Sequence, residues 1–104
     1  MKKNQLSKII KKAKKISTFV FVDECFIEMV PESNESVISH VKKYDNLFIL
    51  RSLTKSFALP GIRIGYAASS KQIIGVLQKI KIPWSVNSLA QDAANISLKN
   101  KTHL

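Results

Sequence analysis

Two short, continuous apolar runs constrain the fold of this chain more than any other feature. They are residues 18–22 and 47–50, and both are rich in β-branched or aromatic side chains. Unbroken runs of this length are typical of strands covered on both faces. Residues 36–44 lie between them and carry apolar side chains at helical spacing, which predicts a short crossover helix. A strand, a crossover and a second strand form a βαβ unit, so the sequence predicts an α/β fold with parallel strands.

One helix is predicted before this unit and one strand after it. Residues 4–16 have apolar side chains on one helical face, with lysines elsewhere. Residues 62–67 resemble a strand, and only about ten residues separate it from the strand before. This spacing is too short for a helical crossover, so we expect the third strand to run antiparallel to the second.

The C-terminal part predicts two more helices. Ser69 or Ser70 caps the first, which runs through Lys81 and ends before Pro83. Ser85 or Asn87 caps the second, which runs to about Lys99. Residues 29–35 contain proline, serine and asparagine and predict a loop.

Lys55 lies in the loop that joins the second and third predicted strands. Ser52 precedes it by three positions and Arg63 follows it by eight. A lysine attacks an aldehyde when its amine is partly neutral, and burial or a neighbouring cation lowers its pKa enough for that. A hydroxyl and a guanidinium together suit a phosphate. An aldehyde and a phosphate on one molecule describe pyridoxal phosphate (PLP), whereas composition alone favours a surface lysine and an arginine in a tight turn.

The residues around Lys55 match a known signature. The match covers Ser52, Thr54, Lys55, Ala58, Gly61, Arg63 and Gly65. In this pattern the stretch resembles the lysine site of the aspartate aminotransferase superfamily, the fold-type I enzymes that use PLP. The resemblance implies that Lys55 is the catalytic Schiff-base lysine. It also implies that Ser52 and Arg63 hold the cofactor phosphate and that Thr54 belongs to the same cofactor-binding set.

Asp23 follows the first predicted strand, at the carboxyl end where open α/β sheets bind ligands. An aspartate there also commonly starts a turn. Residues 22–28 resemble the Asp-Glu-Ala-(Tyr or Phe)-Ile-Glu segment upstream of the lysine in the same superfamily. The resemblance implies that Asp23 pairs with the pyridine nitrogen of PLP and keeps the ring protonated. Phe26 cannot donate a hydrogen bond to the cofactor, as the tyrosine of many aminotransferases does, and this departs from a plain aminotransferase mechanism.

The resemblance also implies how much of a larger fold is present. It predicts part of a three-layer α/β/α large domain with a mostly parallel sheet. Enzymes of this superfamily are several times longer than 104 residues. Residues 1–104 are therefore interpreted as a partial PLP-binding large domain, without its N-terminal part and the C-terminal small domain. We expect this chain to be inactive alone, the complete enzyme to be a homodimer, and a partner fragment to be one way of completing it.

Two enzymes of the superfamily have the most similar motif sequences. Residues 50–61 look most like threonine-phosphate decarboxylase of cobalamin biosynthesis, which decarboxylates L-threonine O-3-phosphate. Histidinol-phosphate aminotransferase ranks second, and residues 83–91 are similar to both. Both act on phosphorylated amino-acid or amine substrates, with the lysine as the proton-transfer group.

The charge of the chain suggests alternatives of another class. The formal net charge is +10, and seven of the first fifteen residues are lysine. Such a run can bind nucleic acid or lie on an anionic membrane. It has no aromatic residue to stack on bases and no arginine to read them, so the solvated face of a helix is the simpler interpretation. A non-catalytic interaction protein and a basic nucleic-acid-binding protein stay open as alternatives.

The remaining composition indicates the cellular setting. Cys25 is the single cysteine, so the chain cannot form an internal disulfide. No apolar run approaches the ~20 residues that span a membrane. We therefore expect a cytoplasmic protein without a membrane partner. His40 lies off the apolar stripe of its segment and is expected to be solvated rather than catalytic.

Overall fold

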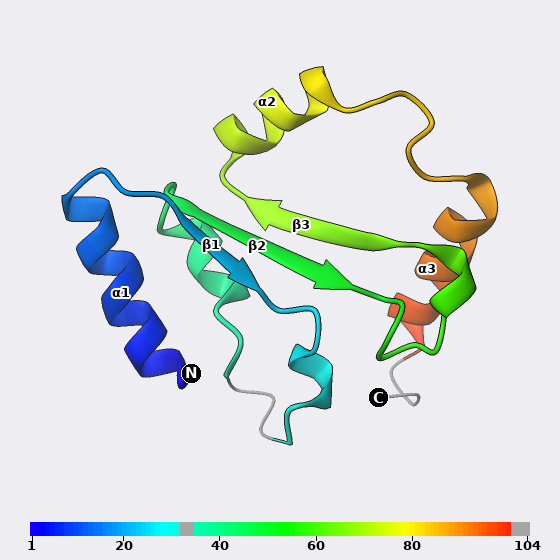
Figure 1. The fold of residues 1–104 in the computed structure, drawn as a ribbon, viewed down its shortest axis with the longest axis horizontal. Helices are drawn as coiled ribbons and strands as arrows, with labels where there is room; N and C mark the ends of the chain where they lie inside the picture. Colours follow the sequence, from blue (N-terminus) through cyan, green and yellow to red (C-terminus); the bar gives the residue numbers. More distant parts are fainter. Residues whose placement is uncertain (32–34, 101–104) are drawn as a thin grey trace.

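The computed structural model describes residues 1–31 and 35–100. Three strands form one sheet in the order β1-β2-β3 (Figure 1). β1 (Val20–Asp23) runs parallel to β2 (Leu47–Ser52), and β3 (Gly65–Ser69) runs antiparallel to β2. The predicted α/β class, the parallel pair and the antiparallel return are confirmed. The sheet of this chain is mixed, because its third strand is reversed.

The connection between β1 and β2 differs from the predicted helix over 36–44. Its described residues form two 3-10 helices, η1 (Ile27–Met29) and η3 (Ile38–Lys42), and no α-helix. The apolar residues of the second part recur every three positions, which is the period of a 3-10 helix. They are Ile38, Val41 and Tyr44, and all three pack against the core. Of the predicted loop over 29–35, residues 32–34 lie outside the described residues.

Three α-helices complete the fold: α1 (Lys3–Lys15), α2 (Lys71–Ile80) and α3 (Ser88–Lys99). The Ser70 and Asn87 side chains accept hydrogen bonds from the first turns of α2 and α3, so these residues are the caps. α1 flanks β1, whereas α2 and α3 lie towards β3 (Figure 1). Within the described part of the chain, none of the helices combines the length and the apolar character that a bilayer span requires.

The core lies on one side of the sheet, where α1 and η3 cover it. Its fully buried side chains are Ile10, Val37, Leu47 and Ile49. A second, smaller cluster joins the loop after β2 to α3 and consists of Leu53, Phe57 and Ala94. The first cluster fixes β1 against β2, and the second fixes the loop that carries Lys55.

The other face of β1 is more open than the continuous apolar run predicts. Phe21 is 58% exposed and stacks on Phe48 with ring centroids 5.2 Å apart. The pleat of the strand turns Val20 and Val22 towards the core and Phe21 away from it. The expectation that both faces are covered is therefore wrong for β1 among the residues that the structure describes.

Candidate functional site

The lysine loop begins directly after β2 and is anchored by buried residues on both sides of Lys55. Leu53 and Phe57 are 2% and 7% exposed and belong to the cluster with α3. The Leu53 N–H donates to the Ile64 carbonyl at 3.1 Å, which joins the loop to the start of β3. The Lys55 side chain is exposed. Its Nζ atom lies 5.7 Å from the centroid of the Phe26 ring, so the amine faces the segment that follows β1.

Asp23 ends β1 at the same sheet edge, because β1 and β2 are parallel. Its Oδ1 atom accepts a hydrogen bond from the Cys25 N–H at 2.9 Å. Hydrogen bonds with Cys25 hold the pKa of Asp23 below its usual value, and the charge of Lys55 lowers it further. The carboxylate is therefore ionised at neutral pH and exposed to a cationic partner. Lys55 Nζ faces the ring of Phe26, three residues after Asp23, so the amine and the Asp23 carboxylate belong to the same edge of the sheet.

Cys25 contributes to this neighbourhood as a neutral group. Its hydrogen bond with Asp23 raises the pKa of the thiol most, and burial raises it further. Lys55 acts in the opposite direction but does not reverse the shift. The thiol therefore stays protonated at neutral pH and is a poor nucleophile.

Three hydroxyl residues alternate through the lysine loop. Ser52 and Thr54 are buried, and their hydroxyl oxygens lie 2.8 Å apart. Two hydroxyls that share one hydrogen bond keep one proton free for another acceptor. Ser56 Oγ is buried and has no hydrogen-bond partner among the described residues. This donor set fits an anion such as the phosphate of PLP, and Ser56 was missed because nothing in the sequence pattern indicates that its hydroxyl is buried.

Arg63 lies just after η4 (Pro60–Ile62) and is exposed. Its Nη1 atom donates to the Pro60 carbonyl at 3.0 Å, within its own turn. No hydrogen bond in the described part of the chain joins Arg63 to Lys55 or to the loop hydroxyls. The backbone nevertheless returns its segment to the site, because Gly65 pairs with Ser52 in the β2–β3 ladder. Among the described residues, the segment of Arg63 thus returns to the predicted site without a hydrogen bond from its guanidinium to the site residues.

A buried ion cluster, which the sequence analysis missed, joins the ends of β1 and β2. Arg51 donates from Nε and Nη2 to Glu24 Oε2 at 3.1 and 2.9 Å, and from Nη1 to Glu28 Oε1 at 3.2 Å. Burial lowers the pKa of Arg51, but interactions with Glu24 and Tyr66 outweigh it, so this pKa lies above its usual value. The signal in the sequence was a charge after each apolar run, which the parallel register places side by side.

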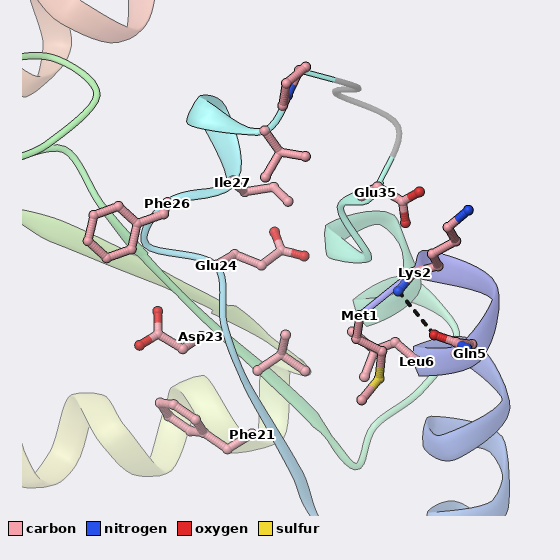
Figure 2. A pocket seen from close by; sticks show the side chains of 13 residues that line it. Met1, Lys2, Gln5, Leu6, Phe21, Asp23, Glu24, Phe26, Ile27 and Glu35 are labelled. Carbon is pink, nitrogen blue, oxygen red and sulfur yellow. Dashed lines mark hydrogen bonds between the residues drawn. The ribbon is translucent and has the colours of Figure 1, made fainter.

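A groove of about 1100 Å³ lies between the start of α1 and the segment of β1 and η1 (Figure 2). Asp23 and Phe26 border it, but Lys55 and Ser52 are not among the described residues that line it. Figure 2 shows the Asp23 and Phe26 side chains on one side of the chain and Glu24 on the other. We therefore locate the candidate site at the lysine loop and not in this groove.

Comparison with known proteins adds relatives to this geometry. A family profile described as aminotransferase class I and II matches residues 1–103. A protein named as a threonine-phosphate decarboxylase, from Caldanaerobacter subterraneus subsp. tengcongensis, is 34% identical over 98% of this chain. A histidinol-phosphate aminotransferase from Buchnera aphidicola subsp. Schizaphis graminum is 39% identical over 81% of it. The crystal structure of a histidinol-phosphate aminotransferase from Clostridium acetobutylicum matches 99% of the chain, with a TM-score of 0.90 and 34% identity.

The chain covers only part of each of these relatives. It corresponds to 28% of the first curated relative, 23% of the second and 31% of the solved chain. The chain therefore spans about a quarter of the length of the curated relatives it matches. The matches confirm the predicted resemblance. Both enzymes that the sequence motifs indicated are among the relatives.

Proposed function

The chain belongs to the class I and II aminotransferase family, whose members depend on PLP, and we propose that it supplies the cofactor-anchoring part of an enzyme for a phosphorylated amino acid or amine. One observation carries this proposal. β1 and β2 are parallel neighbours, so Asp23 and Ser52 end at the same edge of the sheet and Lys55 follows three residues later. Ligands of open α/β sheets bind at that edge.

In this proposal each residue has a separate task. Lys55 is the Schiff-base lysine, and its exposed amine is accessible to an aldehyde. Asp23 pairs with the pyridine nitrogen, for which its lowered pKa suits it. Ser52, Thr54 and Arg63 hold the phosphate: the hydroxyls donate from the loop and the guanidinium adds charge. Arg63 has to give up its hydrogen bond to Pro60 or share it to do so.

PLP, when bound, supplies an electron sink for the electrons left at the substrate Cα atom. The protein residues determine how PLP is held and which side chain transfers the proton. Asp23 would hold the proton on the ring nitrogen, and the Lys55 amine would move a proton at the substrate Cα atom. Phe26 has no hydroxyl, so it offers only its ring face to the Lys55 amine.

Two reactions are candidates for the complete enzyme. The sequence around Lys55 favours decarboxylation of L-threonine O-3-phosphate, as in cobalamin biosynthesis. The similarity to histidinol-phosphate aminotransferases, including the solved structure at TM-score 0.90, favours transamination as the second candidate. Choosing between them is a matter of orienting the substrate, since the bond to be broken must stand perpendicular to the ring. The residues that do this lie mostly outside these 104.

The isolated chain is accordingly proposed to be inactive. Its residues anchor the cofactor, but none is matched to the substrate carboxylate or to the ring face. Further segments, on the same or a partner polypeptide, are needed, and the complete enzyme is proposed to be a homodimer. Because misplacement of about 1 Å can cost about 100-fold in rate, partial assembly is not expected to rescue activity.

A graft tests the proposed role of the chain. Residues 1–100 replace the matched segment of the C. acetobutylicum enzyme, and PLP affinity and turnover are measured. We expect the graft to bind PLP, Lys55→Ala to abolish turnover, and Arg63→Ala to weaken PLP binding by on the order of 2 kcal/mol. Lys71→Ala, in α2, is the matched control and should change neither. A folded graft whose turnover is unchanged by Lys55→Ala would refute the assignment.

The reaction itself is tested on the chain completed with the segments that its relatives have in addition. L-threonine O-3-phosphate and histidinol phosphate are supplied separately, the second with 2-oxoglutarate. Carbon dioxide without glutamate supports decarboxylation, and glutamate without carbon dioxide supports transamination. Turnover by the 104-residue chain alone would show that the substrate-binding groups are already present.

A further inference from the structure

We propose that the buried cluster of Glu24, Glu28 and Arg51, called here the Arg51 clasp, positions Asp23 and Ser52 for the cofactor. This inference rests on the proposed function, because it concerns the same site. The clasp residues do not themselves touch the site. They act through their immediate neighbours in the chain, and are positioning residues rather than catalytic ones.

The clasp is a closely connected hydrogen-bond network. Besides its bonds to both carboxylates, Arg51 donates from Nη2 to Ser36 Oγ at 2.7 Å and from Nη1 to Tyr66 OH at 3.4 Å. Glu24 Oε1 accepts from the Val37 N–H at 2.7 Å. The clasp side chains are 14% exposed for Arg51, 4% for Glu24 and 13% for Glu28. A planar guanidinium with donors in a fixed fork therefore joins β1, η1, β2, β3 and the segment before η3.

The position of the clasp in the sequence links it to the site. Glu24 directly follows Asp23, and Arg51 directly precedes Ser52. Successive side chains of an extended strand point to opposite sides, so a bond that fixes one residue also fixes the direction of its neighbour. Figure 2 shows this where β1 ends: the Glu24 side chain leaves the chain on one side and the Asp23 side chain on the other. The clasp thus orients the ends of two strands through one ion pair.

The chemistry of the clasp argues against stability as its main purpose. Two carboxylates meet one guanidinium, and Glu28 Oε2 is buried without a hydrogen-bond partner among the described residues. Apolar residues of similar volume often replace buried ion pairs without loss of stability. A guanidinium whose Nε and Nη2 atoms both donate to Glu24 Oε2 provides what apolar residues cannot, which is a fixed direction at each strand end.

The test separates orientation from stability by using an apolar replacement. The triple variant Glu24→Leu/Glu28→Gln/Arg51→Met removes all three charges and keeps much of the volume, so that no buried carboxylate is left without its guanidinium. Arg51→Lys keeps the charge but loses the fork. The matched control is Lys14→Met/Asp45→Leu, which removes the exposed ion pair of α1, where Nζ and Oδ1 are 3.0 Å apart. All variants are made in the full chain, and each melting temperature is measured first so that only folded protein is compared.

The first readout does not involve the cofactor. Titration of the Asp23 carboxyl carbon by NMR reports whether its hydrogen bond with Cys25 persists. In the parent chain this pKa lies below the ordinary 3.8, and we expect it to return towards 3.8 in the clasp variants but not in the control. An unchanged Asp23 titration in a folded Glu24→Leu/Glu28→Gln/Arg51→Met variant would overturn the proposal. A merely stabilising clasp would change the melting temperature and leave this titration alone.

The second readout uses PLP itself, with visible absorbance for affinity and induced circular dichroism for orientation. We expect the clasp variants to bind PLP at least about tenfold more weakly and with a smaller dichroic signal, and the control to match the parent chain. Parent-like PLP affinity and dichroism in the triple variant would also overturn the proposal. Failure of the proposed function gives a different result. PLP affinity would then be unchanged by Lys55→Ala, whether or not the clasp variants shift the pKa of Asp23.

Discussion

α1 and α2 are helices of similar pattern with very different surroundings. Both have an apolar face and exposed lysines, yet α1 buries Ile10 and Ala13 in the core, whereas α2 buries no residue at all. Apolar side chains of α2 and the segment after it stay in solvent, with Ile80 70% and Trp84 95% exposed. Amphipathic periodicity thus predicts that a helix forms but not whether a partner surface is present. We infer that α2 contributes little to the stability of this chain.

The largest expected difference between the two helices comes from a matched isoleucine pair. Ile10→Ala leaves a cavity in the fully buried cluster and should lower the free energy of unfolding by about 2–5 kcal/mol. Ile80→Ala removes a side chain that is already 70% exposed and should change it by less than about 0.5 kcal/mol. Denaturant unfolding followed by far-UV circular dichroism measures both. Equal losses would mean that α2 is packed as firmly as α1.

Two glycines extend the comparison to the sheet and to α2. A Cβ atom on Gly65 would lie 2.5 Å from the Arg51 carbonyl oxygen, so Gly65→Ala must push β3 away from β2. We expect a loss of about 1–3 kcal/mol from this overpacking. Gly75 lies inside α2 with no atom within 4 Å of such a Cβ, and Gly75→Ala should instead gain up to about 1 kcal/mol of helix propensity. The sign of the change in unfolding midpoint distinguishes the two; a Gly65→Ala variant as stable as the parent would be inconsistent with the close approach.

The helix caps test whether α3 belongs with the packed part. α3 buries Ala90 and Ala94, and Asn87 Oδ1 accepts from the Ala90 N–H at 2.8 Å. Asn87→Ala should therefore lower the free energy of unfolding by about 1 kcal/mol. Ser70→Ala removes the corresponding cap of α2 and should reduce helicity with little change in the main transition. The opposite ranking would place α2, not α3, in the cooperative unit.

The smallest effect is expected from the exposed ion pair between Lys14 and Asp45. The hydrogen bond with Lys14 is the main cause that lowers the pKa of Asp45 from 3.8. A carboxyl whose pKa is lowered by folding stabilises the folded state above its unfolded pKa, and this contribution is lost as the pH falls through the folded value. The parent and Asp45→Asn should therefore differ slightly at pH 6 and converge as the pH falls through the lowered pKa of Asp45. A difference in the free energy of unfolding that grows as the pH falls would contradict the direction of the Asp45 pKa shift.

Much of the fold could be predicted because the signals are local. Apolar periodicity and caps such as Ser70 and Asn87 depend on residues a few positions apart, and the chain length between β2 and β3 limits their pairing. The crossover was wrong because residues 36–44 are too few to separate a period of 3.0 from one of 3.6. The open face of β1 was missed because a continuous apolar run does not state which of its sides finds a partner.

The candidate site was only partly predictable, for a related reason. Sequence motifs predicted five site residues, because a motif depends only on the order of residue types along the chain. They are Asp23, Ser52, Thr54, Lys55 and Arg63. The Arg51 clasp joins Glu24 and Arg51 across 27 positions, and such a pair becomes visible only when the register of β1 and β2 is known. The buried hydroxyl of Ser56 likewise depends on how the loop folds over its cluster. Contacts of this kind cannot be read from spacing alone.

The position of the lysine that PLP labels is the most direct test of the account. PLP is added to the chain below stoichiometric amounts, fixed with borohydride and located by peptide mass spectrometry. The exposed lysines of α1 serve as an internal comparison, since they lie outside the loop that carries Ser52, Thr54 and Ser56, and one of them, Lys14, pairs with Asp45. The account predicts that the adduct is on Lys55 and that Lys55→Arg removes it without moving it elsewhere. An adduct spread evenly over the exposed lysines, or one that persists in Lys55→Arg, would contradict it.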